Sequence, residues 1–192
     1  MRKLRAFQDA GHQAVLVIGD YTAQVGDPSG KDKTRGSLKA EQVKKFAEGY
    51  LDQVDLVLDM KKTEVRYNSE WFERFSAAEF LQLMSRVTVN QLLAHETFKK
   101  RIEKKAPLGV HELMYPILQG YDSVALQCDI ELGGTDQKFN LLVGRDLQRA
   151  AGQVPQITVT MPILAGLDGV QKMSKSLNNY IGIAEPPQAM YG

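Results

Sequence analysis

Short apolar runs alternate with segments of helical spacing along this chain. The clearest run is Ala14–Ile18, five apolar residues without alternation, which is typical of a strand buried on both faces of a parallel sheet. Strands are predicted at residues 14–18, 64–67, 128–132 and 157–164. Helices are predicted at residues 1–10, 40–54, 110–126 and 135–151, and two more begin at capping-box patterns that start at Ser76 and Thr88. This alternation predicts an α/β fold with a mainly parallel sheet.

A stretch without strand signals separates the two halves of the pattern. Residues 71–105 contain helical patterns only, so we expect a helical insertion at about residues 69–108 between two halves of the sheet. Ligands of open parallel sheets bind outside the carboxyl ends of the strands. The loops that follow Ile18, Leu132 and Leu164 are therefore the predicted site.

The composition is that of an ordinary folded protein. The chain has 192 residues, of which 43% are hydrophobic and 24% charged, and its formal net charge is +1. These values exclude an intrinsically disordered protein and argue against a basic protein that coats nucleic acid. Because Cys128 is the only cysteine, an internal disulfide is excluded and a reducing, cytoplasmic compartment is expected. The run at 14–18 is too short to span a membrane, so no membrane partner is expected.

The loop after the first predicted strand carries several cations. Residues 26–31, Gly-Asp-Pro-Ser-Gly-Lys, are similar to a phosphate loop, but three residues separate the glycines where that motif has four. A β-turn over residues 27–30 explains the string by itself. It does not explain Lys31, Lys33 and Arg35, and cations beside a predicted site suit a polyphosphate ligand.

A polar stripe crosses the predicted helix at 110–126. Tyr115, Gln119 and Asp122 have the spacing i, i+4, i+7, so they share one helical face among apolar neighbours. A solvated face is one interpretation of this stripe. The other is the wall of a pocket, in which phenol and carboxamide oxygens accept from an ammonium group and the carboxylate accepts from a hydroxyl.

Two further motifs follow predicted strands. In Gly133-Gly134-Thr135-Asp136-Gln137, a threonine or aspartate cap explains the polar residues, while the glycines also allow a ligand close to the backbone and the carboxylate suits ribose hydroxyls. The usual Gly-x-Gly-x-x-Gly fingerprint is absent. Lys172-Met173-Ser174-Lys175-Ser176 is a basic loop by composition, but as a string it is the most specific feature of the chain.

This lysine-rich string is similar to the signature loop of class I aminoacyl-tRNA synthetases. With residues 26–31, 115–122 and 133–137 in this order, the chain resembles bacterial tyrosyl-tRNA synthetases from Leu4 to Tyr191. The resemblance implies a Rossmann-like, mainly parallel α/β catalytic domain with a helical connective insertion. It also implies a two-step reaction, in which tyrosine and ATP form tyrosyl-adenylate and a terminal ribose hydroxyl of tRNA(Tyr) then takes the tyrosyl group.

The resemblance assigns a role to each motif. ATP, with Mg²⁺ on its phosphates, is a co-substrate, and neither a tightly bound cofactor nor a metal held by protein side chains is expected. The α-ammonium of tyrosine would contact Tyr115, Gln119 and Asp27, with Thr22 near that end. Asp122 would accept from the phenol hydroxyl, and Gln137 would lie near the reacting carboxylate and phosphate. Residues expected at ATP are Gly133, Asp136, Lys172, Met173 and Lys175, and the catalytic cations that neutralise the leaving pyrophosphate are Lys172, Lys175, Lys31 and Arg35.

The sequence also departs from the family pattern. The His-x-Gly-His signature is absent, and no segment corresponds to the anticodon-recognition domains. We therefore expect residues 1–192 to be an amino-terminally truncated catalytic domain with little or no activity alone. Two alternatives remain open: a tryptophanyl-tRNA synthetase, which shares the fold and the lysine-rich loop, or a non-catalytic folded fragment that dimerises or binds RNA.

The resemblance implies two roles for the insertion. It would form a homodimer interface, with Trp71 in the core or in that interface, and it would lie near the acceptor end of the tRNA. The basic residues there either contact phosphate or form a solvated face; they are Lys99, Lys100, Arg101, Lys104 and Lys105.

Overall fold

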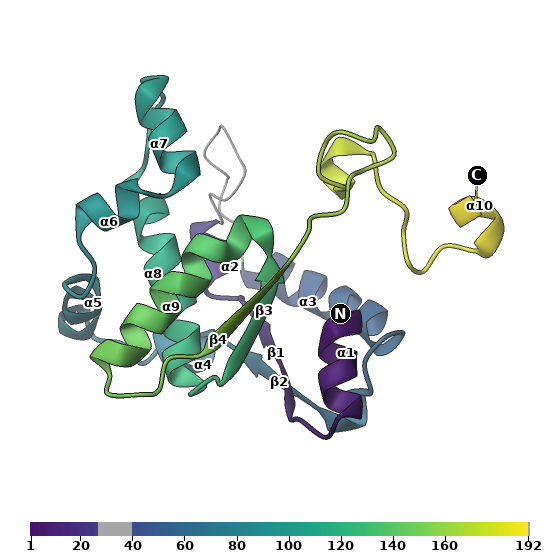
Figure 1. Ribbon diagram of the computed structural model, residues 1–192, viewed down its shortest axis with the longest axis horizontal. Coiled ribbons are helices and arrows are strands. Elements are labelled where there is room, and N and C mark those ends of the chain that lie inside the picture. Colours follow the sequence, from purple (N-terminus) through teal and green to yellow (C-terminus); the bar gives the residue numbers. More distant parts are fainter. Residues whose placement is uncertain (27–39, 192) are drawn as a thin grey trace.

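The computed structural model describes residues 1–26 and 40–191, and within them four strands form two parallel pairs (Figure 1). The pairs are β1 (Ala14–Ile18) with β2 (Thr63–Tyr67), and β3 (Ile130–Gly134) with β4 (Ile157–Met161). Ala14 is level with Thr63, and Ile130 with Ile157. The prediction of a parallel α/β fold is therefore confirmed, although the described strands form two sheets where one was expected.

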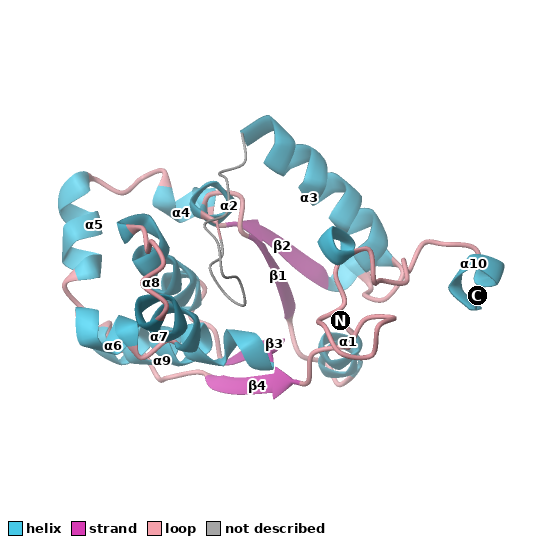
Figure 2. Cartoon of the chain, turned by 90° about the horizontal axis from the view of Figure 1, so that it is seen from above, coloured by secondary structure: helices cyan, strands magenta, loops and turns pink. Residues whose placement is uncertain are grey.

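Helices connect and flank the strands. In chain order they are α1 (Arg2–Asp9), α2 (Thr22–Val25), α3 (Ala40–Asp55), α4 (Ser69–Phe72), α5 (Ala77–Met84), α6 (Val89–Leu93), α7 (Glu96–Glu103), α8 (Val110–Ala125), α9 (Lys138–Ala150) and α10 (Pro187–Tyr191). Short 3₁₀ turns, η1 to η3, occupy Met60–Lys62, Thr135–Gln137 and Lys175–Leu177. Figure 2 shows α3 running beside β1 and β2, with α5 to α9 gathered at the other end of the molecule. None of the helices in the described ranges combines the length and the apolar character needed to cross a membrane.

Capping side chains set the starts of α5, α6 and α7. The side chain of Ser76 accepts from the backbone N–H of Glu79, whose carboxylate accepts from the N–H of Ser76 at 2.7 Å, and the box that begins at Thr88 is also present. The helix that begins after Thr88 is short, because α6 ends at Leu93 and the chain starts α7 anew at Glu96. His95 Nδ1 accepts from the N–H of Thr97 at 3.2 Å and so caps α7.

Two boundaries near the predicted site also differ from the expectation. β4 ends at Met161 and not at residue 164, because Pro162 has no N–H to contribute to the strand pairing. The loop expected at residues 19–36 contains the short helix α2, whose first residue, Thr22, is buried. Both differences lie at carboxyl ends of strands, where tertiary contacts shape the chain more than local pattern does.

Among the residues that the structure describes, the interior contains two apolar clusters. The first joins α4, α5 and α6 to α8 and α9, and consists of Phe72, Leu83, Leu92, Ile117, Leu118, Val143 and Leu147. The second holds α3 against β1, and consists of Leu16, Ile18, Ala47, Val54 and Leu58. The first cluster therefore holds α8 and α9 in place, and the second holds β1 in place, beside the ends of the strands.

Helices α8 and α9 approach each other closely at two glycines. A Cβ atom on Gly120 would lie 2.9 Å from the backbone nitrogen of Gly144, and a Cβ on Gly144 would lie 2.7 Å from Ser123 Oγ. Neither position has room for a side chain. The polar face of α8 is consequently held at a fixed distance from the first turn of α9.

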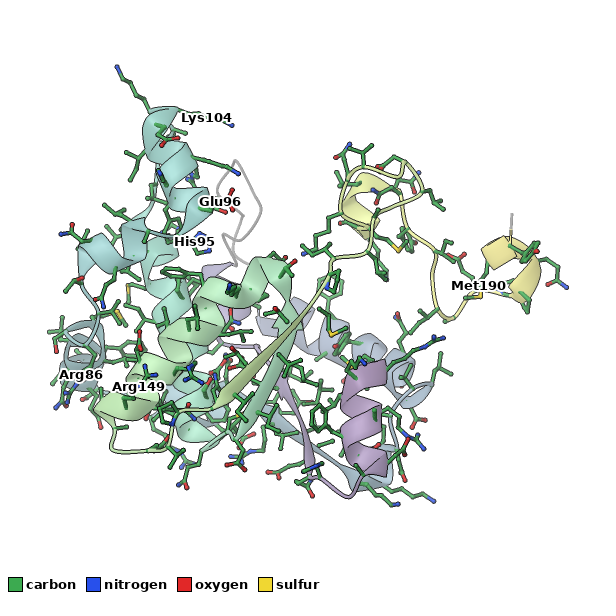
Figure 3. The ribbon with its side chains drawn as sticks, viewed as in Figure 1. Arg86, His95, Glu96, Lys104, Arg149 and Met190 are labelled. Carbon is green, nitrogen blue, oxygen red and sulfur yellow. The ribbon has the colours of Figure 1, made fainter. Side chains whose placement is uncertain are left out.

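A buried ion pair ties α7 to the start of α8. Arg101 Nη1 lies 2.6 Å from Glu112 Oε1, Nη2 lies 3.1 Å from Oε2, and each residue is only 2% exposed. Arg101 also donates to the carbonyl of Pro107, while Glu112 accepts from the N–H of Gly109. Neither alternative for Arg101, a phosphate contact or a solvated face, holds, because its charge is buried and neutralised inside the fold. Lys104, by contrast, stands at the outer end of α7 (Figure 3).

Candidate active site

Asp122 lies where α8 meets the turn that leads from β2 into α4. Its Oδ1 accepts from Trp71 Nε1 at 3.0 Å, and its Oδ2 accepts from Asn68 Nδ2 at 3.4 Å. Asn68 directly follows β2, Trp71 belongs to α4, and Asp122 is in the last turns of α8. Trp71 packs against the first apolar cluster, as expected of a core residue, but its polar edge holds the carboxylate.

Asn68 connects this carboxylate to the loop after β1. Its side chain is fully buried, and Nδ2 also donates to Thr22 Oγ1 at 3.0 Å. Its Oδ1 accepts from the backbone N–H of Tyr21 at 2.9 Å, and its own N–H donates to the carbonyl of Ile18. Asn68 therefore connects Thr22 to Asp122, so Thr22 lies at the end of the site where Asp122 is.

Burial sets the acidity of Asp122. Removal from water disfavours the carboxylate and raises the pKa of Asp122 to about 7. The hydrogen bonds from Trp71 and Asn68 lower the pKa and offset part of this effect, while the charges of Glu131 and Asp20 add to it. The group is consequently a hydrogen-bonding site whose charge changes near neutral pH.

Three side-chain amides meet about one helical turn before Asp122. Asn140 Nδ2 donates to Gln119 Oε1 at 2.7 Å and to Gln137 Oε1 at 3.1 Å. Gln119 projects from α8, Gln137 ends the 3₁₀ turn after β3, and Asn140 lies in the first turn of α9. The structure thus brings together two residues predicted from separate motifs, the helical stripe and the Gly-Gly-Thr-Asp-Gln string.

The strand-end motif and the lysine-rich loop meet through an ion pair. Lys172 Nζ lies 2.6 Å from Asp136 Oδ2. The Asp136 side chain lies over the end of β3, where a Cβ on Gly134 would come within 2.5 Å of Asp136 Oδ1. A side chain at position 134 would displace the Asp136 carboxylate from this place. The two motifs predicted to bind the nucleotide therefore lie side by side.

Asn179 shapes the lysine-rich loop from inside. It is 5% exposed, its Oδ1 accepts from the N–H of Ser174, and its Nδ2 donates to Asp168 Oδ2 and to the carbonyl of Lys172. The hydrogen bond from Asn179, together with those from two backbone N–H groups of the same turn, holds the pKa of Asp168 below its ordinary value. The loop therefore has a defined hairpin shape, in which Lys172 pairs with Ala165 through an antiparallel bridge.

The other predicted residues surround these clusters or lie outside the described part of the chain. Tyr115 is half-buried one turn before Gln119, Gly133 is in β3, Met173 is half-buried and Lys175 is exposed. Asp27, Lys31 and Arg35 lie outside the described residues. Within the described ranges, no group of three or more His, Cys, Asp or Glu side chains could hold a metal ion.

Sequence reasoning missed the side chains that organise the site, namely Asn68, Trp71, Asn140 and Asn179. They belong to no chemical motif, and each acts through another residue. One signal was available for Asn68, because it directly follows β2 and the rule that singled out the loops after other strands applies to it equally.

Residues 1–192 match a family of synthetases described as "tRNA synthetases class I (W and Y)". The chain belongs to this family. This class I synthetase is 57% identical over 192 residues to the tyrosine–tRNA ligase of Oleidesulfovibrio alaskensis, and 55% identical to that of Desulfotalea psychrophila. Each alignment covers 100% of this chain but only 48% and 47% of those relatives, so the chain spans about half the length of the curated relatives it matches.

Solved structures agree with this assignment. The synthetase resembles the tyrosyl-tRNA synthetase of Archaeoglobus fulgidus complexed with L-tyrosine, with a TM-score of 0.75 and 25% identity over 98% of this chain and 56% of that one. It shares the fold of the tryptophanyl-tRNA synthetase of Campylobacter jejuni, with a TM-score of 0.68 and 20% identity over 97% of this chain and 58% of that one. The expected Rossmann-like fold and the resemblance to tyrosyl-tRNA synthetases are confirmed.

Proposed function

We propose that residues 1–192 form the catalytic region of a tyrosine–tRNA ligase, with residues 69–108 as its helical insertion. The reaction joins tyrosine to tRNA(Tyr) with ATP, through tyrosyl-adenylate. The observation that carries the proposal is Asp122, a half-buried acceptor that receives hydrogen bonds from Trp71 and Asn68. The names of the relatives, which are tyrosine–tRNA ligases, support it.

Asp122 gives a physical basis for choosing tyrosine. The phenol hydroxyl donates to the carboxylate and satisfies it when bound water is displaced. Phenylalanine offers no donor and would leave a buried carboxylate without this hydrogen bond, which is costly. The choice over the indole of tryptophan depends on the same contact, because both amino acids are aromatic and the fold is shared with a tryptophanyl-tRNA synthetase.

The first step needs positioning and charge stabilisation, and no covalent bond to the enzyme. Tyr115 and Gln119, with Asp27, hold the α-ammonium group, so the tyrosine carboxylate lies near Gln137. That carboxylate attacks the α-phosphorus of ATP, a new P–O bond forms, and the bond to the pyrophosphate oxygen breaks. Holding two reactants in line lowers the barrier by about 7–11 kcal/mol at best.

The nucleotide is placed by the motifs that meet at the ends of β3 and β4. Gly133 allows the adenosine close to the backbone, and Asp136 accepts from the ribose hydroxyls. Met173 contacts ATP, and the cations that neutralise the departing pyrophosphate are Lys172, Lys175, Lys31 and Arg35. We place Mg²⁺ on the phosphates of ATP, where it would help to neutralise the same charge.

The second step transfers the tyrosyl group to tRNA(Tyr). A terminal ribose hydroxyl attacks the carbonyl carbon of the adenylate, an ester bond forms, and AMP leaves. The basic end of α7, with Lys99, Lys104 and Lys105, supports contact with the acceptor phosphates. The cytoplasm is the compartment in which these substrates meet.

A homodimer formed through the insertion is part of the proposal. The insertion and the start of α8 leave large apolar side chains exposed, with Leu81 72%, Val89 60% and Val110 74% accessible. Analytical ultracentrifugation of the wild-type protein and of a Leu81→Asp, Val110→Asp double variant tests this. A dimer that the charged variant converts to monomer supports the interface, and a wild-type monomer at micromolar concentration rejects it.

The activity is tested by ATP–pyrophosphate exchange with the full-length gene product. Tyrosine should support exchange, and tryptophan and phenylalanine should not. Asp122→Ala should lower the preference for tyrosine over phenylalanine at least tenfold, because the only difference it removes is the acceptor for the hydroxyl. An unchanged preference would show that the phenol binds elsewhere, and exchange with tryptophan alone would assign the chain to the other branch of the family.

A parallel assay separates the catalytic proposal from a non-catalytic fragment. Residues 1–192 are expressed alone and assayed for adenylate formation, which we expect to be weak because the His-x-Gly-His signature is absent. If the full-length gene product is equally inactive, a fragment that only dimerises or binds RNA becomes the better description.

A further inference from the structure

We propose that Asn140 is a positioning residue that decides which end of the Gln119 and Gln137 carboxamides faces the reacting groups. This inference rests on the proposed function, because the reacting groups are those of tyrosine and ATP. Asn140 belongs to none of the segments from which the site was predicted. It acts through Gln119 and Gln137, which do belong to those segments.

The geometry of the contact is specific. Asn140 is 1% exposed, and its single Nδ2 atom donates to Gln119 Oε1 at 2.7 Å and to Gln137 Oε1 at 3.1 Å. An amide nitrogen carries two N–H bonds, so both are used. The two glutamines come from different elements, α8 and the 3₁₀ turn after β3, and Asn140 is the group that fixes one against the other.

Fixing the oxygen of a carboxamide also fixes its nitrogen. Because Oε1 and Nε2 lie on opposite sides of the group, holding Gln137 Oε1 at Asn140 turns Nε2 away from it. Nε2 only donates, which suits the anionic carboxylate and α-phosphate expected near Gln137. A rotated Gln137 would present its oxygen to the same anions and repel them. Gln119 Oε1 retains a second lone pair, which can accept from the α-ammonium group.

The unsatisfied end of Asn140 argues that its role is positional. Its Oδ1 is buried and has no hydrogen-bond partner among the described residues. A buried acceptor without a partner lowers the stability of the fold, and a leucine of similar volume would avoid that penalty. Asn140 is therefore a poor choice for stability and a good one for orienting two glutamines.

The framework around Asn140 keeps these distances short. The contact of Gly120 with Gly144 sets α8 against α9, so Gln119 cannot withdraw from Asn140 without a helix movement. The first turn of α9 directly follows the 3₁₀ turn that carries Gln137. The two glutamines thus rest on one rigid support.

The test compares two nearly isosteric variants in the full-length gene product, by tyrosine-dependent ATP–pyrophosphate exchange. Asn140→Leu releases both glutamines, and we expect kcat to fall about tenfold. Asn140→Asp can only accept, so both glutamines turn their Nε2 atoms to it, and we expect a loss of about 100-fold. The matched control is Gln148→Met, which removes another buried amide of α9, one that bonds the carbonyls of Ser123 and Cys128. It should lower the melting temperature and leave kcat within twofold.

A double variant separates positioning from a general effect on the fold. In a Gln137→Leu background, Asn140→Leu should lower kcat by a smaller factor than it does in the wild type, because Gln119 is then the one carboxamide left to orient. Losses that multiply in full would overturn the inference. A kcat within twofold of wild type for both Asn140 single variants would also overturn it. The same holds if kcat falls in proportion to the melting temperature across the wild type, Asn140→Leu, Asn140→Asp and Gln148→Met. A wild-type protein without exchange activity overturns the proposed function instead, and the inference with it.

Discussion

Asp122 should make the stability of the protein depend on pH in an unusual direction. Burial raises the pKa of Asp122 from an ordinary 3.8 to about 7, so the folded state binds a proton that the unfolded state releases above pH 4. The stabilisation from this protonation is complete below pH 4 and is lost as the pH rises through 7. Most buried carboxylates in ion pairs behave in the opposite way.

The size of the effect follows from the shift. A difference of about 3 pKa units corresponds to about 4 kcal/mol, at about 1.4 kcal/mol per unit. The side chain keeps some contact with solvent, which screens part of this, so about 2–4 kcal/mol is expected. Asp122→Asn removes the ionisation but also replaces an acceptor by a donor that faces Asn68 Nδ2, at a cost of about 1 kcal/mol. The variant should therefore be more stable than wild type at pH 8 by about 1–3 kcal/mol.

The assay is urea denaturation between pH 4 and 8, followed by the fluorescence of Trp71, which is the only tryptophan and donates to Asp122. The wild-type and variant free energies of unfolding should converge or cross below pH 5 and separate above pH 7. Glu131→Gln is the control, because burial also raises the pKa of Glu131. The charge of Glu131 only adds to the burial effect at Asp122, so in the Glu131→Gln background the pH-dependent effect of Asp122→Asn should narrow but persist. A difference between wild type and Asp122→Asn that stays constant within 0.5 kcal/mol (about the error expected of such fits) over this range would refute the reasoning.

Three further predictions address the supports of the site. Arg101→Met should lower the free energy of unfolding by about 3–5 kcal/mol in urea, because it leaves Glu112 buried without its charge partner, and adding Glu112→Leu should restore most of it. Ser76→Ala should lower the melting temperature through the loss of about 1 kcal/mol of helix capping. Lys172→Met should change stability by less than 1 kcal/mol, because Lys172 is 58% exposed, yet it should slow adenylate formation at saturating ATP at least tenfold.

The fold was predictable because its signals are local. The apolar run of β1 and the capping boxes at Ser76 and Thr88 each specify structure within a few residues, and the structure reproduces them. Errors arose where a single residue acts against the local pattern. Pro162 ends β4 early and His95 starts a new helix, and neither effect shows in hydrophobic periodicity.

The site was predictable only in part, because its supports are tertiary. Asn68 and Trp71 reach Asp122 across 54 and 51 residues, and no spacing rule connects such positions. Arg101 stands among lysines in the sequence, and nothing in the local pattern distinguishes it from them, although its partner Glu112 neutralises it inside the protein. Charge in a sequence indicates a surface only until burial and pairing are known.

Helix α8 shows how local sequence spacing and tertiary contacts combine to form the site. Its polar stripe lies at the spacing of a helical face, which is why Gln119 and Asp122 could be found from the sequence. Their chemistry is decided elsewhere, since Asn140 orients the first and burial with Trp71 sets the charge of the second. On the neighbouring face, Gly120 holds the whole helix against α9, so the amide cluster keeps its spacing. A helical stripe thus supplies the groups, and the surrounding buried amides and glycines determine what those groups can do.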